Sequence, residues 1–234
     1  ECLGLRAFLH FDVARLFAED YTRSTSSTRG IPYSTTFDLN NKELLTLHKT
    51  YEAILADLNE AETLLANDTV VNVETSPSSD YLKGRGVLFN KYAVAATKAR
   101  VYYAMGNYTE AARYAQQVLD ATSNFKLKKL SSLDDVKRYP ANGEMIFGLY
   151  NDKLSSNISE MFLNATSRGN FTEARRDIED LYDKSSLSAT STDLRLTTYY
   201  REATAVSSGK TFSFVRFIET PAAVTNSPLK GITL

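Results

Sequence analysis

The sequence predicts a mainly α-helical protein built from helical hairpins, with irregular loops and a few short β-strands. Apolar residues recur at three- and four-residue steps over much of residues 1–122, which is the spacing of amphipathic helices. Polar stretches rich in Ser, Thr and Gly separate these segments. Beyond residue 122 the apolar residues form short alternating runs, which are typical of strands. We therefore expect one region, with a helical core over about residues 1–122 and a loop-rich mixed part over about 123–234.

The first helix is expected over residues 1–18 and an extended segment is expected after it. The predicted apolar stripe of the helix consists of Leu5, Phe8, Leu9, Val13, Leu16 and Phe17. Residues 22–30 are rich in Ser and Thr, so they should form an exposed loop. Pro32 keeps the residue before it out of the helical region, so the segment from Gly30 to Tyr33 should be extended.

Three more helices should complete the helical core. The second is expected over about residues 46–66, with Thr46 as its N-cap. The third should run from about Val87 to Met105, after the loop that ends in Gly84-Arg85-Gly86, and the fourth from Thr109 to about Ala121. The third helix should pack through Leu88, Tyr92, Ala95, Ala96, Ala99, Tyr102 and Tyr103.

Shorter elements are expected in the mixed part. Residues 125–128 and 211–218 alternate like strands, and residues 145–150 form a short apolar run after a glycine. Residues 172–182 resemble a short helix capped by Thr172, with Glu173 in its first turn.

Residues 101–113 resemble the tetratricopeptide (TPR) repeat across the turn between its two helices. Gly106 can adopt the left-handed conformation that ends a helix. Ala99 and Ala111 are small enough for the two helices to approach closely. We expect Tyr108 to wedge between the helices and Tyr102 and Tyr103 to lie in the core. The alternative is a helical hairpin that is unrelated to the TPR repeat.

A second sequence of this type, Gly169 to Ala174, does not continue the pattern. Its distance from Gly106 is not a multiple of the ~34-residue TPR period. We therefore expect a local turn there and no continuous TPR array.

Composition narrows the classes of function. The 234-residue chain has a formal net charge of -1, so nucleic acid is not an expected partner. Its only cysteine, Cys2, cannot form an internal disulfide and is expected to be a small residue in the first helix. No apolar run approaches the ~20 residues that span a bilayer, and residues 1–6 lack the charged-then-apolar layout of a signal peptide. If the protein is exported, we expect its targeting segment to lie outside this chain.

The sequence contains no pattern that points to catalysis. His10 and His48, the only histidines, do not have a metal-binding spacing, and no nucleophile elbow or phosphate loop is present. Carboxylates gather between Glu173 and Asp183, but Arg175 and Arg176 are interleaved with them, which favours a solvated face over a glycosidase pair. A calcium site there is a better expectation than catalysis. We predict no catalytic residues, no cofactor and no metal centre.

Several segments, in order, resemble the SusD/RagB family. Residues 6–17 are similar to its R-A-x-x-x-F-D-L-x-R-x-[FY] helix, and residues 51–61 to its Y-x-x-I-x-x-D-L-x-x-A helix. Gly30-Ile31-Pro32 resembles the extended segment between them. The TPR-like pair, the E-x-I-F sequence at 144–147 and the D-x-R sequence at 193–195 follow in the family's order. The chain lacks the family's lipobox cysteine and has no Trp.

The resemblance implies a cell-surface lipoprotein of the outer membrane, of which this chain would be the N-terminal to middle part. It would bind oligosaccharides or polysaccharides for import through a SusC-like TonB-dependent transporter, and a lipid anchor outside this chain would hold it to the membrane. The alternatives are a TPR-type scaffold for protein partners without a sugar ligand and, less expected, a hydrolase.

Aromatic residues in loops are the candidates for sugar contact. Flat rings stack on the C–H faces of pyranoses, and nearby amides and charged groups bind the hydroxyls. Loop aromatics suit this role better than those in helix stripes. The candidates are Tyr33, Phe37, Tyr81, Phe162 and Phe171. The residues expected to build the TPR-like pair are Ala99, Tyr102, Gly106, Tyr108 and Ala111.

Overall fold

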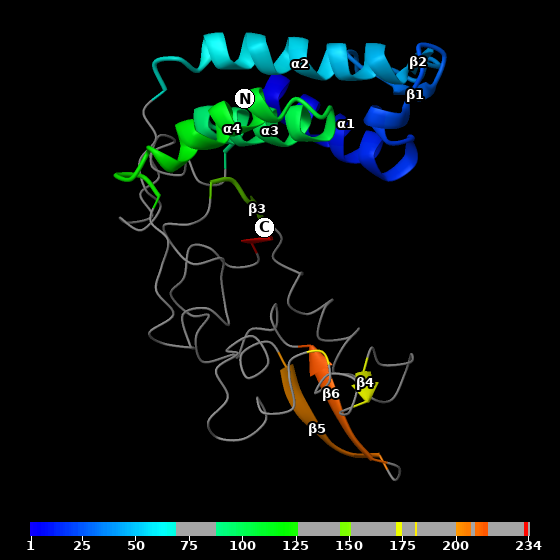
Figure 1. Cartoon of the computed structure of the whole chain (residues 1–234), viewed down its shortest axis with the longest axis vertical. Helices are drawn as coiled ribbons and strands as arrows, with labels where there is room; N and C mark the ends of the chain where they lie inside the picture. Colours follow the sequence, from blue (N-terminus) through cyan, green and yellow to red (C-terminus); the bar gives the residue numbers. More distant parts are fainter. Residues whose placement is uncertain are drawn as a thin grey trace. The chain divides into compact units, whose positions relative to one another are not determined.

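The chain divides into two compact units, one formed by residues 1–126 and 145–147 and the other by residues 127–144 and 148–234. The computed structural model describes residues 1–68, 88–125 and 146–150, together with Leu181 and the segments 172–174, 200–206, 209–214 and 232–233 (Figure 1). Within this described part, no helix combines the length and hydropathy needed to cross a bilayer.

The first unit is helical, as the sequence predicts. Its described helices are α1 (Cys2–Phe17), α2 (Leu47–Leu64), α3 (Lys91–Ala104) and α4 (Tyr108–Leu119) (Figure 1). A 3-10 turn (Tyr21–Arg23) and two short antiparallel strands, β1 (Arg29–Pro32) and β2 (Leu44–Thr46), connect α1 to α2. The strands confirm that the segment around Gly30 is extended.

Helix α1 packs through a different face from the one predicted. Its buried residues are Gly4, Ala7, Phe8, Phe11 and Ala14. The predicted stripe is wrong beyond Phe8, because Leu16 and Phe17 are 76% and 80% exposed. The small residues explain the choice of face, since a Cβ atom on Gly4 would lie 2.5 Å from the ring of Phe89. Close approach of α1 to the segment that carries Phe89 therefore decides which apolar face of α1 is buried.

The start of α2 is capped by Thr46 and packs closely against strand β1. Thr46 is the N-cap, as predicted, and its side-chain oxygen accepts a hydrogen bond from the backbone N–H of Lys49. The Thr50 hydroxyl accepts a hydrogen bond from the backbone N–H of Ile31 at 3.3 Å. A Cβ atom on Gly30 would lie 2.2 Å from the Thr50 hydroxyl, so only glycine allows this approach of β1 to α2.

Helix α3 begins later than predicted and packs on two sides. Asn90 caps it by accepting hydrogen bonds from the backbone N–H groups of Tyr92 and Ala93, so the helix starts at Lys91 and not near Val87. Its buried residues are Ala93, Val94, Ala95, Thr97, Lys98 and Val101. Tyr103, which was expected on the packing side, is 68% exposed.

Helices α3 and α4 form the predicted hairpin. Gly106 has a φ of 76°, the left-handed conformation expected at the turn, and Asn107 caps α4. The rings of Tyr102 and Tyr114 stack 5.7 Å apart across the pair. Nearer the far end of α4, Val118 belongs to the same buried cluster as Ala95, so the two helices run antiparallel.

Tyr108 does not wedge between the helices. Its side chain is 63% exposed, and its ring meets that of Tyr103 edge-on at 5.5 Å outside the core. The stacked rings of Tyr102 and Tyr114 already fill the space between α3 and α4. The expectation that Tyr103 and Tyr108 lie in the core is therefore wrong, whereas Ala111 is buried.

A buried lysine connects three helices of this unit. Lys98 of α3 is 0% exposed, and its ammonium group lies 2.5 Å from Glu62 of α2 and 3.1 Å from the Tyr114 hydroxyl of α4. The ion pair and the hydrogen bond replace the water that the ammonium group loses on burial. Lys98 therefore specifies how α2, α3 and α4 pack together.

The second unit contains strands. β4 (Thr172–Ala174), β6 (Gly209–Phe214) and β5 (Tyr200–Val206) form an antiparallel sheet in that order, and β3 (Leu149–Tyr150) pairs with β7 (Ile232–Thr233). β6 confirms the predicted strand over residues 211–214. The predicted helix is wrong for residues 172–174, whose backbone pairs with β6. Residues 126–128, 144, 169–171, 193–195 and 215–218 lie outside the described residues.

Candidate functional site

Three polar side chains fix the base of the loop that follows β1. The Arg6 guanidinium of α1 donates two hydrogen bonds to the Asp57 carboxylate of α2, from Nε to Oδ2 at 2.6 Å and from Nη2 to Oδ1 at 2.7 Å. The Tyr33 hydroxyl donates a third to Oδ2 at 2.6 Å. Asp57 is only 8% exposed, so these three bonds take the place of its water. The cluster joins α1, α2 and the end of β1.

This arrangement shifts the protonation of both acidic groups in the cluster. Burial acts to raise the pKa of the Asp57 carboxyl, but the hydrogen bonds from Arg6 and Tyr33 outweigh it and hold the pKa below its ordinary value. Burial, together with the hydrogen bond to Asp57, raises the pKa of the Tyr33 hydroxyl well above its ordinary value. At neutral pH Asp57 is therefore ionised and Tyr33 keeps its proton.

Tyr33 is expected to make stability sensitive to alkaline pH. Since its pKa is raised in the folded state, its contribution is present below the unfolded value of about 10 and is lost as the pH rises above it. Tyr33→Phe should lower the free energy of unfolding by about 1.5 kcal/mol at pH 8, and the variant should lose less further stability at high pH than the wild type. Urea unfolding at pH 8 and pH 11 measures both effects.

Tyr108→Phe is the control, because that ring is 63% exposed and outside the core. It should follow the wild type at both pH values. An equal alkaline loss in wild type and Tyr33→Phe would contradict the assignment.

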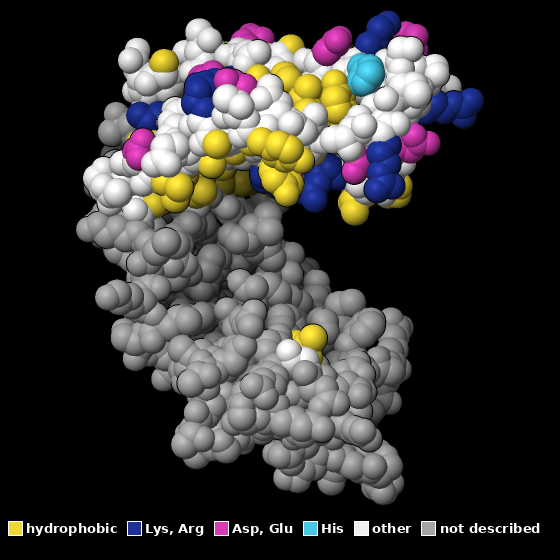
Figure 2. Space-filling view, in the orientation of Figure 1, with side chains coloured by type: hydrophobic (Ala, Val, Ile, Leu, Met, Phe, Trp, Pro, Cys, Tyr) yellow, Lys and Arg dark blue, Asp and Glu magenta, His cyan; other side chains and the backbone are white. Residues whose placement is uncertain are grey.

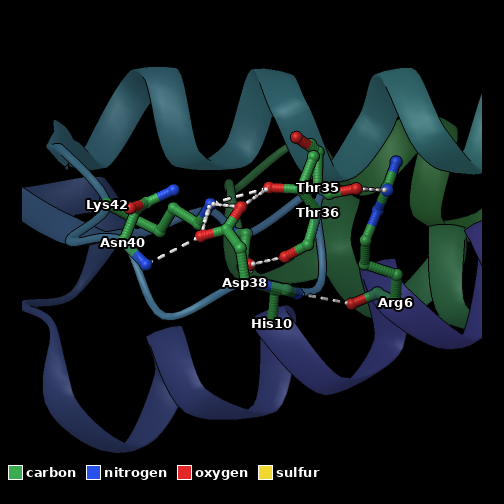
Figure 3. Close-up of polar contacts among 8 residues, drawn as sticks. Arg6, His10, Thr35, Thr36, Asp38, Asn40 and Lys42 are labelled. Atoms are coloured by element: carbon green, nitrogen blue, oxygen red, sulfur yellow. Dashed lines mark hydrogen bonds and ion pairs between the residues drawn. The ribbon is translucent and has the colours of Figure 1, made fainter.

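The loop of residues 33–43, called the β1–β2 loop below, is held by a network of hydrogen bonds (Figure 3). At its start, the backbone N–H of Ser34 donates to His10 Nε2 at 3.1 Å, and Arg6 Nη1 donates to the carbonyl of Thr35 at 3.3 Å. Both anchoring side chains come from successive turns of α1. The loop therefore leaves β1 along a defined path.

Asp38 organises the tip of the β1–β2 loop. Its carboxylate accepts hydrogen bonds from the Thr36 hydroxyl at 2.6 Å, the Asn40 backbone N–H at 2.8 Å and the Lys42 ammonium at 2.8 Å (Figure 3). The hydrogen bond from Lys42, followed by that from Thr36, lowers the pKa of Asp38. The carboxylate is therefore ionised at neutral pH and holds the tip residues around it.

The same loop tip presents two apolar side chains to solvent. Phe37 and Leu39, on either side of Asp38, have relative exposures of 109% and 104%. Large apolar side chains exposed on an ordered loop are available for contact with a ligand or a partner. A ring held in a fixed position beside hydroxyl, amide and charged groups can stack on a pyranose while the polar groups bind its hydroxyls.

The five predicted sugar-contact residues do not share one environment. Phe37 is free in solvent, whereas Tyr33 is half-buried with its hydroxyl bonded to Asp57 and its ring 4.2 Å from that of His10. Tyr81, Phe162 and Phe171 lie outside the described residues. Sequence reasoning missed Arg6, His10 and Asp57 as the groups that hold the loop, although Arg6 and Asp57 lie in the two helix motifs that were singled out.

A second feature of the helical unit is an apolar groove along the α3–α4 hairpin, with a volume of about 740 Å³. Figure 2 shows hydrophobic side chains along the lower edge of the helical unit in this region. The groove is lined by Arg15, Ala99, Arg100, Tyr103, Ala104, Tyr108, Ala111, Ala112 and Ala115. Among the described residues, no cluster of His, Cys, Asp and Glu is placed to hold a metal ion.

Comparison with known proteins identifies the fold. Residues 1–103 match the SusD-like family described as starch-binding and associating with the outer membrane. A SusD superfamily protein from Bacteroides vulgatus is similar over 99% of this chain and 49% of its own, with 17% identity and a TM-score of 0.66. A second one, from Bacteroides thetaiotaomicron, is similar over 98% and 46%, with 19% identity and a TM-score of 0.64.

A SusD-like carbohydrate binding protein from Bacteroides vulgatus is also similar, with 18% identity and a TM-score of 0.56 over 86% of this chain and 39% of that one. No curated protein sequence matches the chain. The chain spans about half the length of the first two of these solved structures. The description of the matching family names starch binding and association with the outer membrane. The predicted SusD/RagB resemblance is confirmed: residues 1–103 match a SusD-like family, and the fold of the chain is similar to that of SusD superfamily structures.

Proposed function

We propose that the protein captures oligosaccharides or polysaccharides at the cell surface for import through a SusC-like, TonB-dependent transporter of the outer membrane. A lipid anchor in the full-length protein would hold it at that membrane. The observation that carries the proposal is the match of residues 1–103 to a family described as starch-binding and outer-membrane associated. The carbohydrate binding protein of similar fold supports the same class of ligand.

Phe37 is the described residue best suited to meet the glycan. Its ring is fully exposed, and the Asp38 network holds the loop on which it stands. Because hydrogen bonds already hold the loop that carries the ring, little backbone entropy should be lost when a sugar stacks on it. Tyr33 fixes the start of this loop through the hydrogen bond from its hydroxyl to Asp57. Tyr81, Phe162 and Phe171 remain candidates for sugar contact.

Titration calorimetry of the full-length protein with a panel of glycans tests the proposal. The panel should contain starch-derived oligosaccharides because of the family description, along with xylan, mannan and pectin fragments. We expect saturable binding of at least one class and recovery of the bound oligosaccharide without cleavage. If no glycan binds to the folded protein, the capture function is wrong; if the bound oligosaccharide is cleaved, the protein is a hydrolase.

Phe37→Ala is expected to weaken glycan binding about tenfold, because it removes a stacking contact of roughly 1 kcal/mol and the desolvation that accompanies it. Leu39→Ala is the matched control, since Leu39 is equally exposed on the same loop but carries no ring. Its affinity should stay within about twofold of wild type, as expected for an exposed side chain outside the contact. Equal losses in the two variants would show that the ring has no specific role.

The groove on the α3–α4 hairpin favours a second candidate function, a TPR-type scaffold that binds protein partners without a sugar ligand. Its alanine floor and exposed Tyr103 and Tyr108 suit an apolar protein segment better than a hydroxyl-rich sugar. Ala115→Trp would fill the groove. The scaffold would be favoured by two results together: the wild type binds a purified protein partner but no glycan, and the Ala115→Trp variant no longer binds that partner.

A further inference from the structure

The hydrogen bonds of His10 require one neutral form of its ring. Nε2 lies 3.1 Å from the backbone nitrogen of Ser34, which can only donate, so Nε2 must accept. Nδ1 lies 2.8 Å from the carbonyl oxygen of Arg6, which can only accept, so Nδ1 must carry the proton. Both bonds are satisfied only when the ring is neutral and its proton is on Nδ1.

Protonation of His10 removes the acceptor that the β1–β2 loop uses. In the charged ring both nitrogens are donors, so Nε2–H would face the N–H of Ser34. The bond between them would be replaced by a repulsive contact, and the amide of Ser34 would lose its partner. The second anchor on α1, from Arg6 to the carbonyl of Thr35, is longer at 3.3 Å and does not depend on His10.

The charges around His10 largely offset one another. On α1 it faces Arg6, on α2 it faces Asp57, and these two groups are paired with each other. Tyr33, at the end of β1, lies against the ring and keeps its proton at neutral pH. The loop itself carries Asp38 and Lys42, which pair with each other, and Glu43 at its end.

We propose that His10 is a pH-sensitive latch for the β1–β2 loop. The neutral ring holds Ser34 and keeps the exposed tip with Phe37 in place, whereas the protonated ring releases the start of the loop. Lowering the pH from 8 to 5, a change that protonates histidine side chains in general, tests the latch. Its consequence for glycan capture rests on the function proposed above, whereas the latch itself does not.

A single tryptophan can report the state of the loop, because the chain contains none. Leu39→Trp places it at the tip, on a side chain that is fully exposed and outside the proposed sugar contact. We expect the fluorescence anisotropy of the full chain to fall as the pH is lowered from 8 to 5, in a one-proton transition, while far-UV circular dichroism stays constant. An anisotropy that does not change over this interval overturns the latch.

The two histidines provide a matched pair of variants in the Leu39→Trp protein. His10→Gln replaces the ring by an amide that does not titrate, so the transition should be lost. His48→Gln should retain it, because His48 lies on α2, where its Nε2 is 3.2 Å from the Ser24 hydroxyl and its ring packs on that of Tyr21. A transition that survives His10→Gln, or disappears only in His48→Gln, assigns the switch elsewhere.

Nitrogen NMR of the imidazoles tests the latch without any substitution at His10. At pH 8 the His10 ring should show a protonated Nδ1 and an unprotonated Nε2, and acidification should shift the amide signal of Ser34 in parallel with Nε2. The opposite tautomer at pH 8 overturns the proposal.

Calorimetry with a glycan that binds at pH 8 then separates the two proposals. Affinity should be about fivefold lower at pH 5, the ratio that one ordinary hydrogen bond supports. Unchanged affinity together with a clear anisotropy transition would leave the latch in place and remove the loop from the glycan site.

Discussion

Replacing Phe11 by Ala is expected to lower the free energy of unfolding by about 4 kcal/mol, the cost of removing a fully buried aromatic side chain and leaving a cavity. Phe11 is 0% exposed and meets the ring of Tyr51 edge-on at 6.0 Å. The guanidinium groups of Arg15 and Arg100 lie 5.6 and 5.4 Å from the centre of its ring. Few rearrangements can fill the space, because α1, α2 and α3 all meet there. Urea unfolding followed by circular dichroism measures the loss.

Phe17→Ala is the matched control on the same helix. Phe17 is the same residue type but is 80% exposed, so its removal should change stability by less than about 0.5 kcal/mol. The pair of variants tests directly which face of α1 is buried. A large loss in Phe17→Ala and a small one in Phe11→Ala would mean that the face predicted from the sequence is right and the packing described here is wrong.

Periodicity could predict that α1 exists but could not choose its face. The helix carries apolar residues on two sides, with large ones such as Leu9, Leu16 and Phe17 on one and Gly4, Ala7 and Ala14 among those on the other. Size alone does not choose between them, because the second side also carries Phe8 and Phe11. The fold instead buries the side that lets α1 approach its neighbours closely, and this choice depends on where Phe89 lies, 85 residues from Gly4 along the chain.

Local signals explain why the α3–α4 hairpin could be predicted. Gly106 and Asn107 act on the turn that contains them, through a left-handed backbone conformation and a helix cap, so no distant contact is needed. The position of Tyr108 could not be derived in this way. It depends on Tyr102 and Tyr114 filling the space between the helices first.

The loop site needs contacts that no sequence pattern contains. The motif comparison picked out Arg6 and Asp57 in separate helices, but their pairing joins residues 51 positions apart. Tyr33 could be recognised as a loop aromatic, yet only the fold shows that its hydroxyl is bonded to Asp57. Phe37 could be predicted as exposed because it follows a polar, proline-containing segment that has no helical stripe to join.

Removing the guanidinium of Arg6 is expected to have the second-largest effect. Arg6→Ala leaves the Asp57 carboxylate, 8% exposed, with Tyr33 as the remaining side-chain donor of its three hydrogen bonds. Loss of one partner from such a buried pair should lower the free energy of unfolding by about 3 kcal/mol at pH 7. Arg113→Ala is the control, because its pair with Glu110 is exposed to solvent and its loss should change the free energy of unfolding far less.

Neutralising the stranded carboxylate separates its charge from the lost packing of Arg6. Asp57→Asn in the Arg6→Ala background should recover part of the loss, since an uncharged amide is less costly to bury than a carboxylate.

The free energy of unfolding measured at acidic pH gives a further check. The lowered pKa of Asp57 means that its stabilising contribution is present above pH 4 or so and is lost as the pH falls through the folded value, so the wild type should lose more stability on acidification than Arg6→Ala. If both proteins lost the same amount of stability on acidification, the ionisation of Asp57 would not depend on Arg6. The support of the β1–β2 loop would then have to come from His10 and Asp38.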